Sequence, residues 1–153
     1  MPHVVLVNPE IPPNTGNVAR TCAAMAVELH LVKPLGFELS DRYLKRAGLD
    51  YWPHVQLQIH ESWQAFAIAA HQRGGRLIGF STSGTQSYLD ITYASNDWLL
   101  FGKETAGLST SMLKACDITA RIPMQEPSVR SLNLSVSVAI GLFEALRSIQ
   151  SCP

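Results

Sequence analysis

The chain has 153 residues, 46% of them hydrophobic, and its 12 basic side chains balance its 12 acidic ones to a formal net charge of zero. This length and apolar content fit one domain, over residues 1–153, with a sizeable core. The balanced charge excludes a protein that is basic throughout, so any nucleic-acid surface must be a local patch. No apolar run approaches the roughly 18 residues that span a bilayer, so we expect no membrane segment.

The cysteines and histidines do not follow the pattern of a metal site. Cys22, Cys116 and Cys152 are odd in number and widely spaced, which argues against a disulfide framework or a zinc site and fits a reducing cytoplasm. The first ten residues lack the basic and apolar regions of a signal peptide. The histidines have neither metal-ligand spacing nor an identifiable carboxylate partner, so we expect structural or exposed roles for His3, His30, His54, His60 and His71.

The first half of the chain alternates strand-like and helix-like segments. A strand over 3–7 leads into a proline-rich loop, and Asn14 or Thr15 is placed to cap a helix over about 17–25. The elements expected next are a strand over 29–32, a helix capped by Ser40 or Asp41 that holds Tyr43, Leu44 and Ala47, a strand over 55–59, and a helix begun by Ser62 and ended by Gly74 and Gly75.

Three apolar strands of the second half run into loops rich in Gly, Ser, Thr or Pro. Strands separated by helices indicate an α/β domain, with a mainly parallel sheet flanked by helices. Ligands bind beyond the C-terminal ends of such strands, so the three loops are expected to share one pocket. Their glycines, Gly84, Gly102 and Gly107, serve either that pocket or simply a turn. The three strands are expected over residues 77–80, 98–101 and 118–122.

The segment 120–140 joins the last of these loops to a long apolar helix. Two prolines argue against helix over 124–130. From Leu134 onward apolar residues surround nearly the whole helical wheel, which is typical of a helix buried by its own core and often by a partner as well. The polar residues placed to cap this helix are Ser131, Asn133 and Ser135.

Three motifs resemble those of a known enzyme family. NPEIPPNTGNVARTCA over 8–23, FGKETAGL over 101–108, and RIPM followed by SLNLSVSVA within 121–139 occur in this order. Together they resemble the SpoU branch of the SPOUT RNA 2′-O-ribose methyltransferases. KRAGLDYW over 45–52 resembles a narrower group, the minimal methyltransferases of the tRNA wobble position.

The resemblance implies a fold and an activity. The implied fold is a single α/β domain whose C-terminal segment forms a deep trefoil knot, and the implied assembly is a homodimer whose active site is completed across the interface. The implied reaction methylates the ribose 2′-hydroxyl of cytidine or modified uridine at position 34, in the tRNA anticodon loop, with S-adenosylmethionine as methyl donor. A related enzyme of ribosomal RNA or another tRNA position, and a non-catalytic RNA-binding module, are the alternatives.

The resemblance also assigns residues to the site. Glu104, in the second motif, either binds a polar part of the ligand or caps the helix near Gly107. The residues implied to bind S-adenosylmethionine are Phe80, Ser81, Gly102, Ile122, Met124, Ser131 and Leu132.

Arg20 is the residue to which the resemblance assigns removal of the proton from the 2′-hydroxyl. Because guanidinium is protonated at neutral pH, we favour a different role, a bidentate clamp on the RNA phosphate. Asn14 either orients the substrate or Arg20, or caps its helix. Asn133 lies either near the reacting ribose or at a helix cap.

A second cluster suits RNA. Arg42, Lys45 and Arg46 share one face of the expected helix, and Tyr51 and Trp52 follow closely. The basic residues either bind RNA phosphates beside an aromatic that stacks on a base, or form a solvated face in front of core aromatics.

Overall fold

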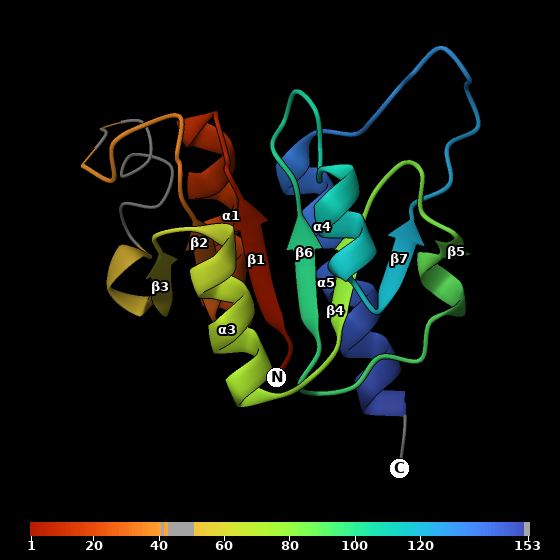
Figure 1. Cartoon of the computed structure of the whole chain (residues 1–153), viewed down its shortest axis with the longest axis horizontal. Coiled ribbons are helices and arrows are strands. Elements are labelled where there is room, and N and C mark those ends of the chain that lie inside the picture. The colour runs from red at the N-terminus through yellow and green to blue at the C-terminus, as the bar shows by residue number, and fades with distance from the viewer. Residues whose placement is uncertain (41, 43–50, 152–153) are drawn as a thin grey trace.

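The computed structural model describes residues 1–40, 42 and 51–151, and these form a seven-stranded sheet. Every strand pairs in parallel with its neighbours, in the order β3-β2-β1-β6-β4-β7-β5 (Figure 1), which confirms the predicted α/β class. The strands are β1 His3–Val7, β2 Leu29–Val32, β3 Leu57–His60, β4 Leu77–Phe80, β5 Gln86–Ser87, β6 Trp98–Phe101 and β7 Ile118–Arg121.

Four predicted strands, β1, β2, β4 and β6, agree with the structure residue for residue. β3 begins two residues later than expected because Val55 follows a 3₁₀ turn, and β7 ends at Arg121, one residue early. The two-residue strand β5 was not predicted. The helix expected around 43–47 and its cap Asp41 lie outside the described residues. The helices are α1 Pro12–Ala24, α3 Trp63–Arg73, α4 Thr110–Ala115 and α5 Leu134–Ser151, with 3₁₀ turns η1 Trp52–His54 and η2 Tyr88–Asp90.

Helices cover both faces of the sheet. Alternate residues of β1 point to opposite faces, so Val4 packs with the apolar side of α1 and α5 while Val5 packs with α3 and α4. In Figure 1, α3 and α4 lie in front of the sheet and α5 lies behind it. Burial on both faces explains why these strands are continuously apolar rather than alternating.

The start of α1 differs from the prediction. The helix begins at Pro12 with Ile11 as its N-cap, so neither Asn14 nor Thr15 caps it, and both are buried within its first turn. The reason is that proline suits the first helical positions, where the amide hydrogen that it lacks has no intrahelical partner.

The ends of α3 confirm the prediction. The Ser62 hydroxyl accepts a hydrogen bond from the Ala65 amide at 3.1 Å, as an N-cap does. At the other end Gly74 and Gly75 have φ values of 79° and 97°, which end the helix in the left-handed region.

The connection from β7 to α5 is irregular over 122–133, as the two prolines predict. Of the three expected caps only Asn133 has the role, because its Oδ1 accepts from the amides of Ser135 at 2.9 Å and Val136 at 3.4 Å. α5 packs against α1 and β6 but leaves Val136 and Phe143 about half exposed. The trefoil knot implied for this segment stays a prediction. Within the described residues no helix is both long and apolar enough to cross a bilayer.

Candidate functional site

A cavity of about 450 Å³ opens at the C-terminal ends of four neighbouring strands, β1, β6, β4 and β7. Its walls come from the loops that follow these strands. The prediction that the loops after 77–80, 98–101 and 118–122 share one pocket is therefore confirmed. The loop after β1, which carries the first motif, contributes Ile11 as well.

The cavity gathers the residues that the resemblance assigned to the cofactor. All seven line it, and so do Asn14, Asn133 and Glu104. Two basic side chains that the sequence did not single out for this site, Lys103 and Arg130, also line it. The seven are Phe80, Ser81, Gly102, Ile122, Met124, Ser131 and Leu132.

One side of the cavity is apolar. The rings of Phe80 and Phe101 stack with centroids 4.6 Å apart and planes 18° apart, and both side chains are buried. Ile122, Met124 and Leu132 are only partly buried, so they leave apolar surface facing the cavity. A concave apolar wall with backbone polar groups at its edge suits a flat heterocycle.

A tight hairpin, residues 103–107, forms another part of the cavity wall. The Gly107 amide donates to the Lys103 carbonyl at 2.8 Å, and Gly107 has a φ of 68°. A Cβ on Gly102 would lie 2.0 Å from the Gly107 carbonyl carbon, so only glycine fits beneath the hairpin. Gly102 therefore lines the cavity and also permits the turn, and the two roles are not alternatives.

Glu104 projects from this hairpin to the start of α1. Its Oε1 accepts from the Glu10 amide at 2.9 Å, and its Oε2 accepts from the Ile11 amide at 2.6 Å. The prediction that it caps the helix near Gly107 is wrong, since that helix, α4, is capped by Ser109. Glu104 instead supplies the acceptor for the free amides before α1, whose own N-cap has no side-chain bond.

Asn14 and Asn133 connect the three motifs. The Asn14 amide group donates to Glu104 Oε2 at 3.3 Å, and the Asn133 amide group donates to Asn14 Oδ1 at 3.1 Å. Asn133 in turn caps α5. The sequence missed a second link, in which Glu10 Oε1 accepts from the Thr105 hydroxyl at 2.6 Å and amide at 3.1 Å. The signal for this link was the acidic residue in each of the first two motifs, Glu10 and Glu104.

Replacing Glu104 by Gln tests this network. The isosteric amide has one acceptor instead of two, so an NH₂ group faces a backbone donor at the start of α1. We expect the free energy of unfolding, measured by urea titration, to fall by about 2 kcal/mol. Glu61→Gln is the control, because Glu61 is 78% exposed and its ion pair among the described residues is with the surface residue Lys33. Equal losses for the two variants would contradict the role of Glu104.

Arg20 stands apart from the cavity of its own chain. It is exposed on α1, six positions after Asn14, which places it about 120° away around the helix. It is not one of the described residues that line the cavity. Its guanidinium carbon lies 4.4 Å from the centroid of the Tyr51 ring. One chain therefore does not bring Arg20 to the predicted site.

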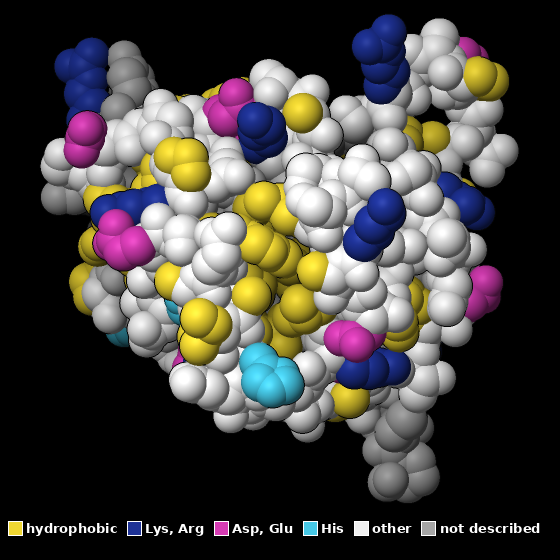
Figure 2. Space-filling view, in the orientation of Figure 1, with side chains coloured by type: hydrophobic (Ala, Val, Ile, Leu, Met, Phe, Trp, Pro, Cys, Tyr) yellow, Lys and Arg dark blue, Asp and Glu magenta, His cyan; other side chains and the backbone are white. Residues whose placement is uncertain are grey.

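The second predicted RNA cluster is described in part. Arg42 is exposed, while Lys45 and Arg46 lie outside the described residues. Trp52 is partly buried against the core, as the structural alternative expects. On the face shown in Figure 2, basic and acidic side chains are interspersed among the described residues rather than gathered by sign.

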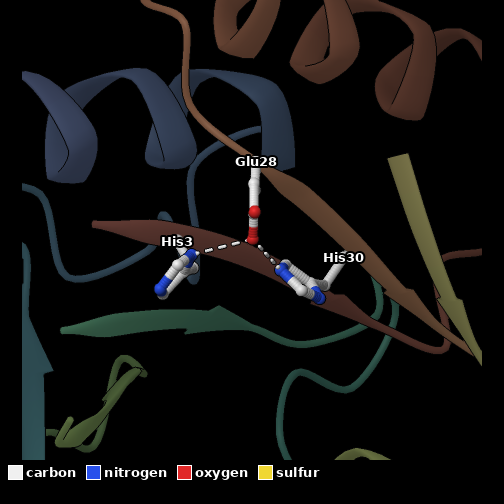
Figure 3. A group of neighbouring side chains, drawn as sticks. All are labelled: His3, Glu28 and His30. Carbon is white, nitrogen blue, oxygen red and sulfur yellow. Dashed lines mark hydrogen bonds and ion pairs between the residues drawn. The ribbon is translucent and has the colours of Figure 1, made fainter. Parts of the chain in front are cut away.

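His3 and His30 lie beside Glu28 on the α3 face of the sheet (Figure 3), and His60 contacts His30. His3 Nδ1 and His30 Nε2 lie 3.1 and 3.0 Å from Glu28 Oε2, and His60 Nε2 lies 2.9 Å from His30 Nδ1. The expectation that the histidines have no carboxylate partner is thus wrong for His3 and His30. The pairing of β1 with β2 brings His3 to Glu28. Glu28 and His30 lie two positions apart on one face of the same extended segment, a spacing that is visible in the sequence.

His3, Glu28 and His30 lie close enough together to bind one metal ion. The Glu28 carboxylate, however, already forms an ion pair with the guanidinium of Arg73. Arg73 Nη1 donates to Glu28 Oε2 at 2.9 Å, and this bond is the main reason that the pKa of Glu28 falls to about 2. Because Glu28 is then an acceptor only, His30 donates to it through Nε2. We therefore interpret the cluster as a hydrogen-bonded network that joins α3 to the sheet.

This cluster should make stability depend on pH. Burial lowers the pKa of His3 and His60, and it lowers the pKa of His30 to about 4, below the 6.5 of an unfolded chain. The unfolded state therefore binds more protons than the folded state below pH 6.5. The contribution of these histidines to the free energy of unfolding is fully present above pH 6.5 and is lost as the pH falls toward 4. From the lowered pKa of His30 alone, we expect the free energy of unfolding to fall by about 2 kcal/mol between pH 7.5 and pH 5, as measured by denaturant titration.

His30→Asn and His71→Asn provide the matched pair for that measurement. His30→Asn should flatten the dependence, whereas His71, exposed on α3, should leave it unchanged. If the free energy of unfolding of His30→Asn depended on pH as steeply as that of the wild type, the dependence would come from other groups.

The described cysteines, Cys22 and Cys116, are free thiols. Burial raises the pKa of Cys22 to about 12 and that of Cys116 to about 11, so both stay protonated at neutral pH. A protonated thiol is a weak nucleophile, because the thiolate is the reactive form.

Comparison with known proteins identifies the family. A tRNA (cytidine(34)-2′-O)-methyltransferase of Burkholderia cenocepacia is 47% identical over 147 residues, 95% of this chain and 94% of that protein. A protein of Synechocystis sp., provisionally given the same name, is 58% identical over 151 residues, 99% of each chain.

Solved structures agree with these relatives. One, from work on 2′-OH methylation of C/U34 on tRNA, superposes with a TM-score of 0.93 at 51% identity and covers 97% of this chain and 95% of its own. The SpoU methyltransferase AviRb of Streptomyces viridochromogenes, in complex with AdoMet, has a TM-score of 0.88 at 25% identity over 96% of this chain and 59% of its own. The SpoU rRNA methylase family model matches residues 1–143, and the chain belongs to that family.

Proposed function

We propose that this chain methylates the ribose 2′-hydroxyl of the wobble nucleotide of tRNA, cytidine or modified uridine at position 34, with S-adenosylmethionine as donor. The observation that carries the proposal is the cavity that all three family motifs line. The wobble position itself rests on the relatives of similar length, which are named for cytidine 34. We place the enzyme with its tRNA in the cytoplasm.

The cavity fits the proposed cofactor. Ile122, Met124 and Leu132 offer an apolar wall to the adenine, and the Gly102 backbone faces the same space. The structure of AviRb with AdoMet supports this choice of ligand. S-adenosylmethionine supplies the electrophilic methyl group, and the protein positions the reactants.

The polar residues of the site align the acceptor. Two successive hydrogen bonds, from Asn14 to Glu104 and from Asn133 to Asn14, hold the two asparagine side chains at fixed positions in the cavity wall. We assign Asn14 and Asn133 to the orientation of the ribose, and Arg20 to a bidentate clamp on the adjacent phosphate. The group that accepts the 2′-hydroxyl proton stays unassigned.

A homodimer would complete this site. Arg20 is absent from the described lining of its own cavity, so a clamp by Arg20 requires a partner subunit. α1, which carries Arg20, packs against α5, and α5 exposes Val136 and Phe143 one heptad apart. An exposed apolar stripe beside the helix of Arg20 supports association through α1 and α5.

Arg42, Lys45 and Arg46 are proposed to hold the anticodon stem or loop through its phosphates. Each phosphate contact releases counterions, so affinity should fall steeply with salt. Neutralising the three residues together should reduce the slope of log Kd against log salt by about 2 to 3, as filter binding measures it. A slope equal to the wild type would remove these residues from the interface.

The decisive experiment is transfer of labelled methyl groups from S-adenosylmethionine to total tRNA, followed by nucleoside mapping. Ribose methylation at position 34 would establish donor, acceptor and position together. Methylation elsewhere in tRNA, or of ribosomal RNA alone, would overturn the wobble assignment. Failure to bind S-adenosylmethionine would overturn the enzyme and favour an RNA-binding module.

A further inference from the structure

We infer that Tyr51 is a positioning residue for Arg20, and that its ring holds the guanidinium in the orientation needed to clamp the RNA. The inference rests on the proposed function of Arg20. The observation behind it is the stacking of the two groups, with the Arg20 guanidinium carbon 4.4 Å from the centre of the Tyr51 ring. This distance lies well within the range of a cation–π contact.

The Tyr51 ring is a fixed platform. Tyr51 is the N-cap of η1, and its carbonyl accepts from the His54 amide at 2.8 Å. η1 packs against α1, and the next residue, Trp52, packs against the core. The ring itself is only partly buried, so one side can carry the arginine.

Arg20 needs such a platform. Its side chain is exposed, and an unrestrained arginine loses rotamer entropy when it is fixed in a complex. Among the described residues, the Tyr51 ring contacts its guanidinium. Ordering Arg20 before RNA binds therefore removes part of that cost from the reaction.

Stacking orients the guanidinium without consuming its hydrogen-bond donors. The ring contacts its flat face, so the N–H groups at its edge remain available to a phosphate. Arg73 shows the contrast, because it lies over Trp98 at 5.3 Å but donates two hydrogen bonds to Glu28. Compared with Arg73, Arg20 is the arginine whose N–H groups are turned to an external anion. Because Arg20 covers a face of the Tyr51 ring, this role differs from the stacking on an RNA base that the sequence suggested for the aromatic residues.

Two substitutions of Tyr51 distinguish the contribution of its aromatic ring from that of its hydroxyl group. Tyr51→Phe keeps the aromatic face and should retain kcat within about twofold, whereas Tyr51→Leu removes it and should lower kcat about fivefold. The KM for S-adenosylmethionine and the melting temperature should be unchanged in both variants. A purely structural role of Tyr51 would move the melting temperature instead.

A double-mutant cycle with Arg20→Ala, in single-turnover assays with excess enzyme, makes the test specific. Tyr51→Leu should cause no further loss in the Arg20→Ala background, because its effect passes through Arg20. An equal fivefold loss in both backgrounds, or equal kcat for Tyr51→Leu and Tyr51→Phe, would overturn the inference. Wild-type activity of Arg20→Ala alone would instead overturn the proposed clamp, so the two failures are distinguishable.

Discussion

Arg20→Ala should reduce methyl transfer to tRNA by at least about a hundredfold while S-adenosylmethionine binds as before. Arg20 is exposed and lies outside the described lining of the cavity, so its removal should leave the fold and the cofactor pocket intact. Single-turnover transfer and cofactor titration measure the two quantities separately. Lys114→Ala, exposed on α4 at the other face of the sheet, is the control. Activity near that of the wild type would refute the clamp.

Gly102→Ala should abolish cofactor binding and destabilise the chain. The new Cβ would lie 2.0 Å from the Gly107 carbonyl carbon and 2.1 Å from the Leu108 amide nitrogen. These are backbone atoms, so the hairpin 103–107 must move, and the cavity wall moves with it. We expect the free energy of unfolding to fall by about 3 kcal/mol and S-adenosylmethionine affinity by at least about a hundredfold, measured by denaturation and calorimetry.

Gly74→Ala separates the two effects of that substitution. Gly74 has a φ of 79° and ends α3 away from the cavity, and a Cβ there meets no atom within 4 Å. It should cost about 1 kcal/mol of stability through backbone strain and leave cofactor binding unchanged. Loss of cofactor binding in Gly74→Ala would show that binding follows global stability rather than the shape of the hairpin.

Mixing the two inactive variants tests the shared active site. If Arg20 acts on the cavity of the partner subunit, a mixed dimer of Arg20→Ala and Gly102→Ala has one cavity that is intact and receives an intact Arg20. Random assortment should then restore about a quarter of wild-type activity. No recovery, with mixed dimers demonstrated, would place Arg20 in the cavity of its own chain.

Local patterns predicted much of the scaffold correctly. β1, β2, β4 and β6 are short apolar runs bounded by loop residues, and a strand buried on both faces needs no other signal. Ser62 capped α3 as expected because an N-cap bond joins residues three apart. α1 shows the limit, since two prolines at the start of a helix resemble a loop as much as a first turn.

Contacts between distant residues could not be predicted in this way. Glu104 caps a helix that begins more than 90 positions earlier, and Glu28 meets His3 only because β1 and β2 are neighbours. Both carboxylates were visible in the sequence, but their partners depend on which strands lie side by side. The role of Tyr51 beside Arg20 has the same origin.

By itself the sequence determined the α/β class and the three loops that share one cavity, because strand ends are local features of the chain. The family motifs indicated seven of the residues that line that cavity. The tertiary structure alone decided how these parts are held. It tied Glu104 to the start of α1 and Asn14 to Asn133, and it turned Arg20 away from its own cavity toward Tyr51. The physical reason is that hydrogen bonds and ring contacts depend on the positions of atoms in space, which are set only when the sheet and its helices pack together.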